Sequence, residues 1–296
     1  NSINGYTTEL VTTTATSFSG TAAALVTAVT NAGGGVTGVD VPVSVTDTGV
    51  VDAGDLEDLV DQVQADDTDN VVTVTSSVTG ISGTFAEVNA LVTDEGNDII
   101  TGIDTLPITL TDDGVTAANT ATVQGLTSGV VTATVSTTDL GDLGALVGTG
   151  DALTITIADD ALTASLVVAV DAVTTLPITL SSTDQTITGN IADVTSFFSS
   201  SGITKSQDDA DVTISGNVTV AQLNVIQPQT TGVITAASVT TTDMATLSTI
   251  TGSAAAAGSG NTYTITISDA EVVASEVTAL AAKTSGNVTM NQANTI

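Results

Sequence analysis

The chain has 296 residues, of which 33 are Asp or Glu and two are Lys, and it contains no Arg, His, Cys or Trp. Its net charge of −31 excludes nucleic acid as a partner, because binding to phosphate is driven by Lys and Arg. The absence of His and Cys excludes a Ser-His-Asp or Cys-His catalytic arrangement and a conventional zinc site, and we expect no enzyme.

The first recurring element is an anchor segment of about ten residues. Its five copies begin at offsets of 63, 55, 51 and 53 residues (83−20, 138−83, 189−138, 242−189), at Gly20, Gly83, Thr138, Gly189 and Thr242. In the last four copies a large apolar residue stands at the third, sixth and ninth place, as Phe85, Val88 and Leu91 do. A recurrence of this kind is typical of stacked repeats.

A second recurring element lies between the anchors, at residues 41–47, 106–112, 153–159, 211–217 and 263–269. In it aliphatic residues alternate with Thr, Ser or Pro, which predicts half-buried strands. Helix-like stretches follow, for example at 56–63, 162–170 and 273–280. A Thr-Ser/Thr-Gly turn then leads into a further strand, and it recurs at 127–129, 230–232 and 284–286.

One repeat is therefore strand, short helix, strand, short helix. Because its turns are short, stacking successive strand–helix coils in parallel is the economical arrangement. We predict an α/β repeat solenoid with one parallel sheet and the helices on the opposite wall; an all-β parallel solenoid is the alternative. Residues 1–296 form a single segment of this kind, with repeats at approximately 6–70, 71–129, 130–174, 175–232 and 233–286, and 287–296 as the start of a truncated sixth repeat.

Aspartates stand at equivalent places where four of these strands end, at Asp47, Asp112, Asp159 and Asp269. A carboxylate at such a place predicts an N-cap of the helix that follows. Calcium ligation is the alternative, since Ca²⁺ is bound by six to eight oxygens from carboxylates, carbonyls and water.

Two other acidic clusters are better calcium candidates. Residues 94–100 resemble one nonapeptide of the calcium-binding RTX family, and their candidate ligands are Asp94, Asn97 and Asp98. A predicted loop holds the second cluster, Asp208, Asp209 and Asp211. A solvated acidic turn is the alternative for this second cluster, and Asp66, Asp67 and Asp69 form a similar cluster. Ca²⁺ is the one cofactor that the sequence suggests.

Threonines alternate along several predicted strands, as at Thr132 and Thr134 or Thr264 and Thr266. A flat ladder of such threonines resembles the ice-binding face of some solenoid antifreeze proteins. The alternative is the polar outer face that any soluble sheet needs, since Thr is a good strand former.

The succession of ITLTDDGVTAA (108–118), a helix, TSGVV (127–131), a Leu-x-x-Leu segment and ITG resembles the long repetitive cell-surface proteins of marine bacteria, picocyanobacteria in particular. This resemblance implies an exported filamentous or surface-layer protein tied to adhesion, motility or defence. We therefore expect a structural segment of an extracellular fibre or giant cell-surface protein, which acts by mechanical extension and surface display. Its expected partners are neighbouring repeats of the same longer chain, or further copies in a fibre.

Three alternatives to this function remain open at the level of sequence. One is a calcium-stiffened adhesin or binding module of the RTX type. Another is an ice-binding solenoid. The third, a carbohydrate-active enzyme, needs two carboxylates in a cleft, normally with aromatic platforms, and aromatic residues make up 2% of the chain. Because no apolar run approaches the ~18 residues of a spanning helix, membrane insertion is not expected.

Overall fold

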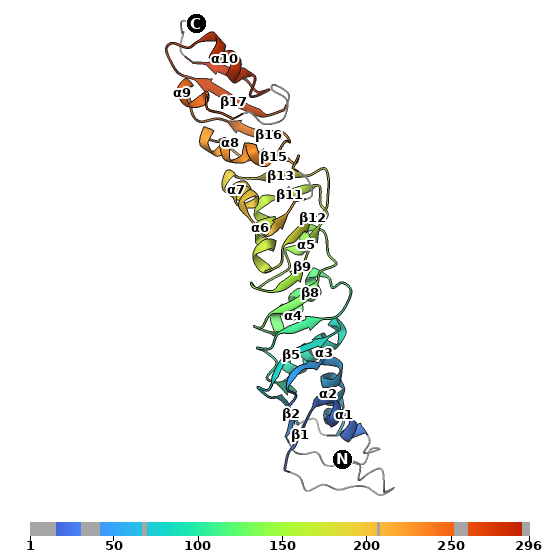
Figure 1. Ribbon diagram of the computed structural model, residues 1–296. Coiled ribbons are helices and arrows are strands. Elements are labelled where there is room, and N and C mark those ends of the chain that lie inside the picture. The colour runs from blue at the N-terminus through green and yellow to red at the C-terminus, as the bar shows by residue number, and fades with distance from the viewer. Residues whose placement is uncertain (1–15, 31–41, 67–69, 206–207, 252–259, 292–296) are drawn as a thin grey trace. The chain divides into compact units, whose positions relative to one another are not determined.

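The computed structural model describes residues 16–30, 42–66, 70–205, 208–251 and 260–291 (Figure 1). The chain divides into two compact units. Unit 1 comprises Asn1–Thr137, Ala145–Thr154 and Val173–Thr175, and unit 2 comprises Thr138–Gly144, Ile155–Ala172 and Leu176–Ile296. Parts of the first and sixth predicted repeats, residues 6–15, 31–41 and 292–296, lie outside the described residues.

Unit 1 contains two sheets and four helices among its described residues. The first sheet has the order β1 (Phe18–Gly20), β2 (Val43–Val45), β4 (Val72–Val74), β6 (Ile100–Thr101). The second has the order β3 (Gly49–Asp52), β5 (Val78–Gly83), β7 (Ile108–Leu110), β8 (Val131–Thr134), β9 (Ala152–Thr154). The helices are α1 (Ala22–Thr30), α2 (Ala53–Asp66), α3 (Phe85–Gly96) and α4 (Ala117–Leu126).

Unit 2 is built in the same way. One sheet has the order β10 (Thr156–Ile157), β12 (Ile178–Leu180), β14 (Ile203–Thr204). The other has the order β11 (Ala161–Thr163), β13 (Thr186–Gly189), β15 (Asp211–Ile214), β16 (Ile234–Ser238), β17 (Thr262–Ile267), β18 (Val288–Met290). The helices are α5 (Leu140–Leu143), α6 (Ala164–Val173), α7 (Ile191–Ser199), α8 (Val220–Ile226), α9 (Met244–Leu247) and α10 (Ala274–Ala281), and the 3-10 turn η2 (Gln227–Gln229) follows α8.

Strand pairing within each described sheet is parallel and joins one coil to the next, where a coil is one or two strands with the helix that follows. In unit 1, for example, Ile81 stands opposite Ile108, which in turn stands opposite Val131. All three side chains are buried. Because the inward residues of successive strands are in register, each coil adds a layer of apolar side chains to the core.

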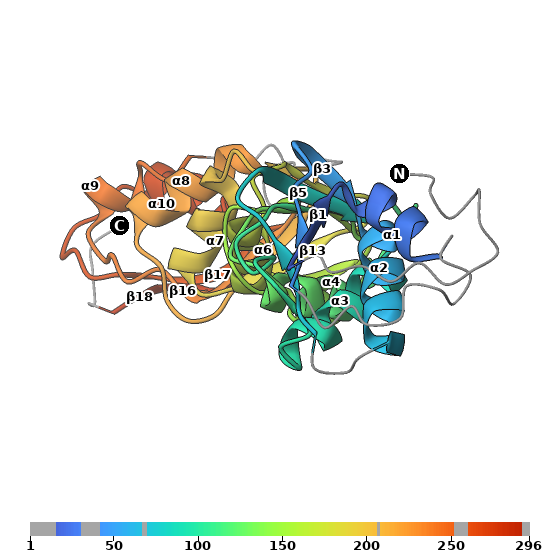
Figure 2. The same cartoon turned by 90° about the horizontal axis from the view of Figure 1, so that it is seen from below.

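The predicted α/β class with parallel strands is confirmed, and the strands predicted at 106–112 and 211–217 appear as β7 and β15. The prediction of a single sheet is corrected to four sheets among the described residues. In several coils the chain turns between two strands, as it does between β2 and β3, so neighbouring coils pair through two separate ladders. In unit 1 the helices α1 to α4 pack one after another, to one side of β3 and β5 in Figure 2.

The anchor segments form the helices α1, α3, α5, α7 and α9. Their apolar residues at intervals of three face the core: Val88 and Leu91 in α3 are fully buried, and so is Leu143 in α5. The anchor pattern is therefore typical of helices whose single apolar side is covered by the strands.

The strand-end aspartates cap helices, but not the helices that follow them. The Oδ2 atom of Asp112 accepts a hydrogen bond of 2.6 Å from the backbone N–H of Phe85, the first residue of the preceding helix α3. The helix after Asp112 is α4, and Thr116 caps it. The other three aspartates act in the same way, at distances of 2.8, 2.7 and 2.6 Å: Asp47 on Ala22, Asp159 on Leu140, and Asp269 on Met244.

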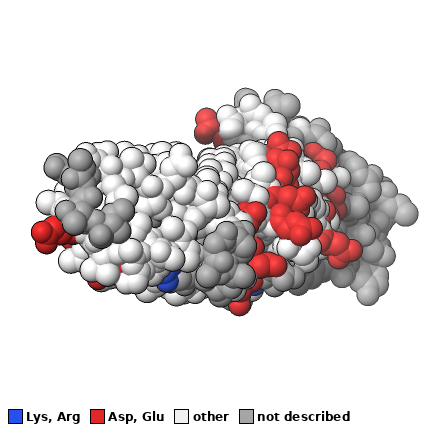
Figure 3. Space-filling model, turned by 90° about the horizontal axis from the view of Figure 1, so that it is seen from above, with Lys and Arg blue, Asp and Glu red and all other residues white. Residues whose placement is uncertain are grey.

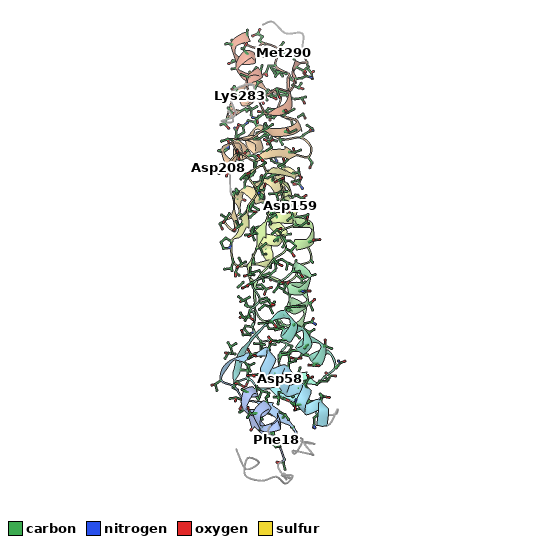
Figure 4. The ribbon with its side chains drawn as sticks, turned by 90° about the vertical axis from the view of Figure 1, so that its right-hand side faces the viewer. Phe18, Asp58, Asp159, Asp208, Lys283 and Met290 are labelled. Carbon is green, nitrogen blue, oxygen red and sulfur yellow. The ribbon has the colours of Figure 1, made fainter. Side chains whose placement is uncertain are left out.

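This cross-coil cap follows from the strand register. The N–H of the residue before each aspartate donates to a backbone carbonyl of the preceding coil. That carbonyl belongs to the residue just before the helix N-cap, as Gly83 does when it accepts from Thr111 at 2.9 Å. The next side chain then lies beside the first turn of that helix. Asp159, labelled in Figure 4, occupies this place after β10. The sequence analysis identified the capping residues correctly but assigned them to the wrong helix.

Where the Thr-Ser/Thr-Gly turn occurs, it binds its coil to the one before it. The Thr127 hydroxyl donates to the carbonyl of Leu106 at 2.6 Å and accepts from the N–H of Gly129 at 2.9 Å. The N–H of Ser128 donates to the carbonyl of Asp104 at 2.8 Å. Equivalent bonds are formed at 230–232 and 284–286.

Glycine is required at the end of this turn because the two backbones approach closely. A Cβ atom on Gly129 would lie 2.5 Å from the carbonyl carbon and oxygen of Leu106. Gly125, four residues earlier in α4, has no atom within 4 Å of the same position. We expect Gly129→Ala to lower the free energy of unfolding by about 2 kcal/mol or more, as overpacking against a backbone does.

The matched control is Gly125→Ala, which removes a glycine from a helix and is expected to stabilise the chain by up to about 1 kcal/mol. Urea unfolding followed by circular dichroism measures both variants. Equal midpoints for the two would contradict the role assigned to the turn.

The two units contain counterparts at a constant distance along the chain. Three residues of unit 2 lie 103 positions after the same residue type in unit 1 (219−116, 227−124, 230−127): Thr219 after Thr116, Gln227 after Gln124, and Thr230 after Thr127. The distance becomes 104 at Asp139 and Asp243 (243−139). The register shift between Thr235 and Ser238 in β16 accommodates the additional residue. The chain therefore carries a longer repeat of about two anchor periods.

Candidate functional site

The strongest concentration of chemistry-bearing side chains among the described residues lies on α2 and α3. We call it the acidic helix face, and its members are Asp55, Glu57, Asp58, Asp61, Glu87 and Asp94. The two helices pack against each other. Figure 3 shows acidic side chains gathered in one region of the face drawn, and Figure 4 marks Asp58.

The sequence of α2 places these carboxylates on its outer side. Leu56, Leu59, Val60 and Val63 are buried against the core. The acidic residues between them, at spacings of three and four, must then share the opposite side, where residues one helical turn apart are neighbours. The acidic helix face is therefore a consequence of the same periodicity that builds the helix.

Burial and mutual repulsion raise the pKa values of several of these groups. The pKa of Asp94 is raised first by burial and then by the charge of Asp61. The pKa of Glu57 is raised by burial and by the charges of Asp61 and Asp58, with smaller contributions from Asp94 and Glu87. Asp55 is affected in the same way, by burial and by Asp52.

Such an arrangement can concentrate cations, because its carboxylates repel one another and are relieved by any positive charge. A metal site needs more than this, namely ligands that converge on one point. Among the residues that the structure describes, no group of three or more His, Cys, Asp or Glu could hold a metal ion.

The first calcium candidate forms the end of α3. Asp94 lies in the last turn, and its carbonyl accepts hydrogen bonds from the N–H groups of Asn97 at 3.3 Å and Ile99 at 2.8 Å. Asp98 has a φ of 59°, the left-handed conformation that commonly follows a helix. Local helix termination accounts for the backbone of this RTX-like segment.

The second calcium candidate lies against a later turn of the chain, at Thr231 to Val233. The carbonyl of Asp208 accepts from the N–H of Thr231 at 2.6 Å, and Oδ1 of Asp211 accepts from the N–H of Val233 at 2.7 Å. Asp209 also lies against this turn, since a Cβ on Gly232 would be 2.3 Å from its carbonyl oxygen. Asp67 and Asp69, of the third cluster, lie outside the described residues. Calcium binding stays a prediction for all of them.

Sequence reasoning missed a polar bridge in unit 1 and the related polar side chains of unit 2. The Gln124 amide donates to Oδ2 of Asp151 at 2.6 Å, and Oδ1 of Asp151 accepts from the N–H of Val131 at 2.8 Å. In unit 2, Asn261 accepts from the N–H of Ile234 at 2.9 Å. Gln227, the counterpart of Gln124, instead donates to the Tyr263 hydroxyl at 3.4 Å. The 103-residue spacing of the two glutamines was the available signal.

Comparisons with protein-family models, with curated proteins and with solved structures found no match for this chain. Among the described helices, none has the length and apolar character needed to cross a bilayer.

The raised pKa values predict how stability depends on pH. A carboxyl whose pKa is higher in the folded state than its ordinary value of 3.8 (Asp) or 4.5 (Glu) takes up a proton sooner when folded. We therefore expect the urea midpoint to rise as the pH falls from 7 through the raised pKa values of these groups, and to rise likewise when salt is added at pH 7, because salt screens the repulsion.

The variant Asp94→Asn should weaken both dependences, whereas Asp113→Asn, an equal change of net charge at an exposed residue outside the face, should not. Below the ordinary carboxyl range the trend reverses at one capping residue, Asp243. Hydrogen bonds from Thr246 lower the pKa of Asp243, so this cap loses its contribution as the pH falls through that lowered value. A midpoint that does not rise between pH 7 and the ordinary carboxyl range would contradict the account of the acidic helix face.

Proposed function

We propose that this chain is a structural segment of a long repetitive extracellular protein, a fibre or giant cell-surface protein, in which stacked coils form a solenoid and carry load. It acts by mechanical extension and display at the cell surface rather than by catalysis. Its partners are neighbouring repeats of the same longer protein, or further copies of it.

The observation that carries this proposal is that the hydrogen bonds between coils join each coil to its neighbour along the chain. Successive coils are joined by parallel ladders, to which strand-end caps and Thr-x-Gly turns are added in several coils; β5–α3, for example, is joined to β7 by its ladder, by Thr111 and by the cap of Asp112 on Phe85. Coils bonded in this way can be added without changing any existing contact. This is the property that a protein of great length requires.

Two further observations support it. The counterparts 103 residues apart are what growth by duplication of whole repeats leaves behind. The net charge of −31 makes the chain repel itself at low ionic strength, whereas at about 0.5 M salt the Debye length is only about 4–5 Å. An exterior, saline location suits such a composition.

The test is the length and exposure of the native polypeptide in its source cells. An antibody to residues 105–135 would probe a large-protein gel before and after proteinase K treatment of intact cells. We expect a band far above the 29.1 kDa of this chain, and we expect it to disappear on treatment.

A cytoplasmic enzyme of the same cells, probed on the same gel, must stay intact as the control for cell integrity. A protected band near 29 kDa would mean that the chain is a complete protein inside the cell, and the proposal would then be abandoned.

Strand register favours a second candidate, ice binding. In the sheet of unit 2 one residue of each of five successive strands is a threonine, and these residues stand opposite one another in register: Thr163, Thr188, Thr213, Thr235 and Thr262. All are at least partly exposed. Because parallel strands lie about 4.8 Å apart, hydroxyl and methyl groups repeat at that interval. Asp211 stands in the neighbouring row of the same face.

Ice binding predicts that the chain shapes ice crystals and shows thermal hysteresis. Replacing the central threonine, as Thr213→Lys, should abolish both effects, whereas Ser165→Lys at an exposed position of α6 should leave them unchanged. Unmodified crystal growth in the presence of the native chain would rule this candidate out and leave the structural proposal untouched.

A further inference from the structure

The helices α3 and α7 occupy the same place in the longer repeat. Each follows a strand that ends in glycine, Gly83 or Gly189. In both, the carbonyl of that glycine accepts a hydrogen bond from the next coil, from Thr111 at 2.9 Å and from Ser215 at 2.8 Å. The residue that follows the donor is therefore the cross-coil capping position in both coils.

The two coils differ at that position. In the first it is Asp112, whose carboxylate caps Phe85. In the second it is Gly216, which has a φ of 98° and has no side chain to offer. Ile191, the first residue of α7, therefore receives no carboxylate from the following coil, and α7 depends on its own N-cap, Asn190.

The caps within each coil add to this difference. Thr84 and Glu87 of α3 form a reciprocal capping box, in which the N–H of Thr84 donates to Oε2 of Glu87 at 2.7 Å. In α7 the Asn190 side chain accepts from the N–H groups of Ala192 and Asp193 at 2.9 and 3.0 Å. Asn190 also donates to Oδ2 of Asp193 at 2.6 Å. Side chains thus accept from three backbone N–H groups at the start of α3 and from two at the start of α7.

An independent observation points to the same coil. Gln185 directly precedes β13 and is only 6% exposed, and its Nε2 atom has no hydrogen-bond partner among the described residues. A buried donor without a partner destabilises the folded coil, because in the unfolded coil the same amide forms hydrogen bonds with water.

We propose that the coil formed by β13 and α7 opens more readily than its counterpart formed by β5 and α3, so that the chain yields first at a fixed place. The role of this coil as a yield point under load rests on the proposed structural function. The order of opening does not, and it can be measured on the isolated chain.

The repulsion within the acidic helix face works in the opposite direction, because Glu57 and Asp94 destabilise the packing of α3 on α2. In salt at about 0.5 M the Debye length is about 4–5 Å, so this repulsion is largely screened. The opening of the two coils must therefore be compared at that ionic strength, where the difference in capping and in buried amides determines which coil opens first.

Hydrogen exchange followed by mass spectrometry tests the order of opening. We expect amides of 191–199 to exchange at least about fivefold faster than those of 85–96 after correction for intrinsic rates, the factor that a lost cap of ordinary strength gives. Equal protection of the two helices, or slower exchange in α7, would overturn the proposal.

Two variants distinguish this cause from a generally lower stability of unit 2. Gln185→Met keeps the volume and removes the unpaired amide, so exchange in α7 should slow while α3 is unchanged. Asp112→Ala removes the cross-coil cap, so exchange in α3 should rise about fivefold. Asp113→Ala, with the same change of charge at the adjacent exposed residue, should have no such effect.

If Asp112→Ala leaves α3 fully protected, the cross-coil cap does not set local stability and the proposal fails. Removal of the high-molecular-weight band by protease, the test of the proposed function, has an outcome independent of this one.

Discussion

Every coil of a parallel strand ladder leaves one row of backbone N–H and C=O groups for the next coil to satisfy, and buried groups of this kind are costly when unpaired. In this chain the ladder sets the positions of the other inter-coil contacts. The register that aligns Ile81 with Ile108 also places Asp112 beside the first turn of α3 and brings the Thr127 hydroxyl to the carbonyl of Leu106. Apolar layers, caps and turns therefore repeat together, because all of them depend on the same alignment.

The charge of the chain is distributed in accordance with this arrangement. Carboxylates such as Asp47 and Asp159 act as hydrogen-bond acceptors at helix N-termini, where a negative charge is favourable. Asp55, Glu57 and Asp94 on α2 and α3, by contrast, have pKa values that are raised by burial and by neighbouring carboxylates. The same residue type is thus stabilising at one place and destabilising at another, and salt or acid acts mainly on the second group. A protein of this composition is best suited to saline surroundings, in agreement with the proposed extracellular role.

Much of the fold could be predicted from local pattern. Alternation of Thr with Ile or Leu predicted β7 and β17, and the apolar spacing at 56–63, 162–170 and 273–280 predicted α2, α6 and α10, because these periods follow directly from strand and helix geometry. The division of the strands among four sheets could not be predicted, since it depends on where a coil turns between two strands. The acidic clusters were equally ambiguous. Asp94 and Asp211 look alike in sequence, yet one is near a helix end and the other receives a backbone N–H of the following turn.

The sequence by itself determined the repeat, the α/β class with parallel strands, and the exclusion of chemistry that requires His, Cys or Arg, because composition and period are local properties of the chain. Only the tertiary structure decided which helix each strand-end aspartate caps. Asp269 is separated from Met244 by a whole coil, and they become neighbours only when strands of successive coils align. It also decided that Gly216 stands where other coils carry a capping carboxylate. Contacts between coils depend on register, and register is a property of the stacked layers rather than of any one segment.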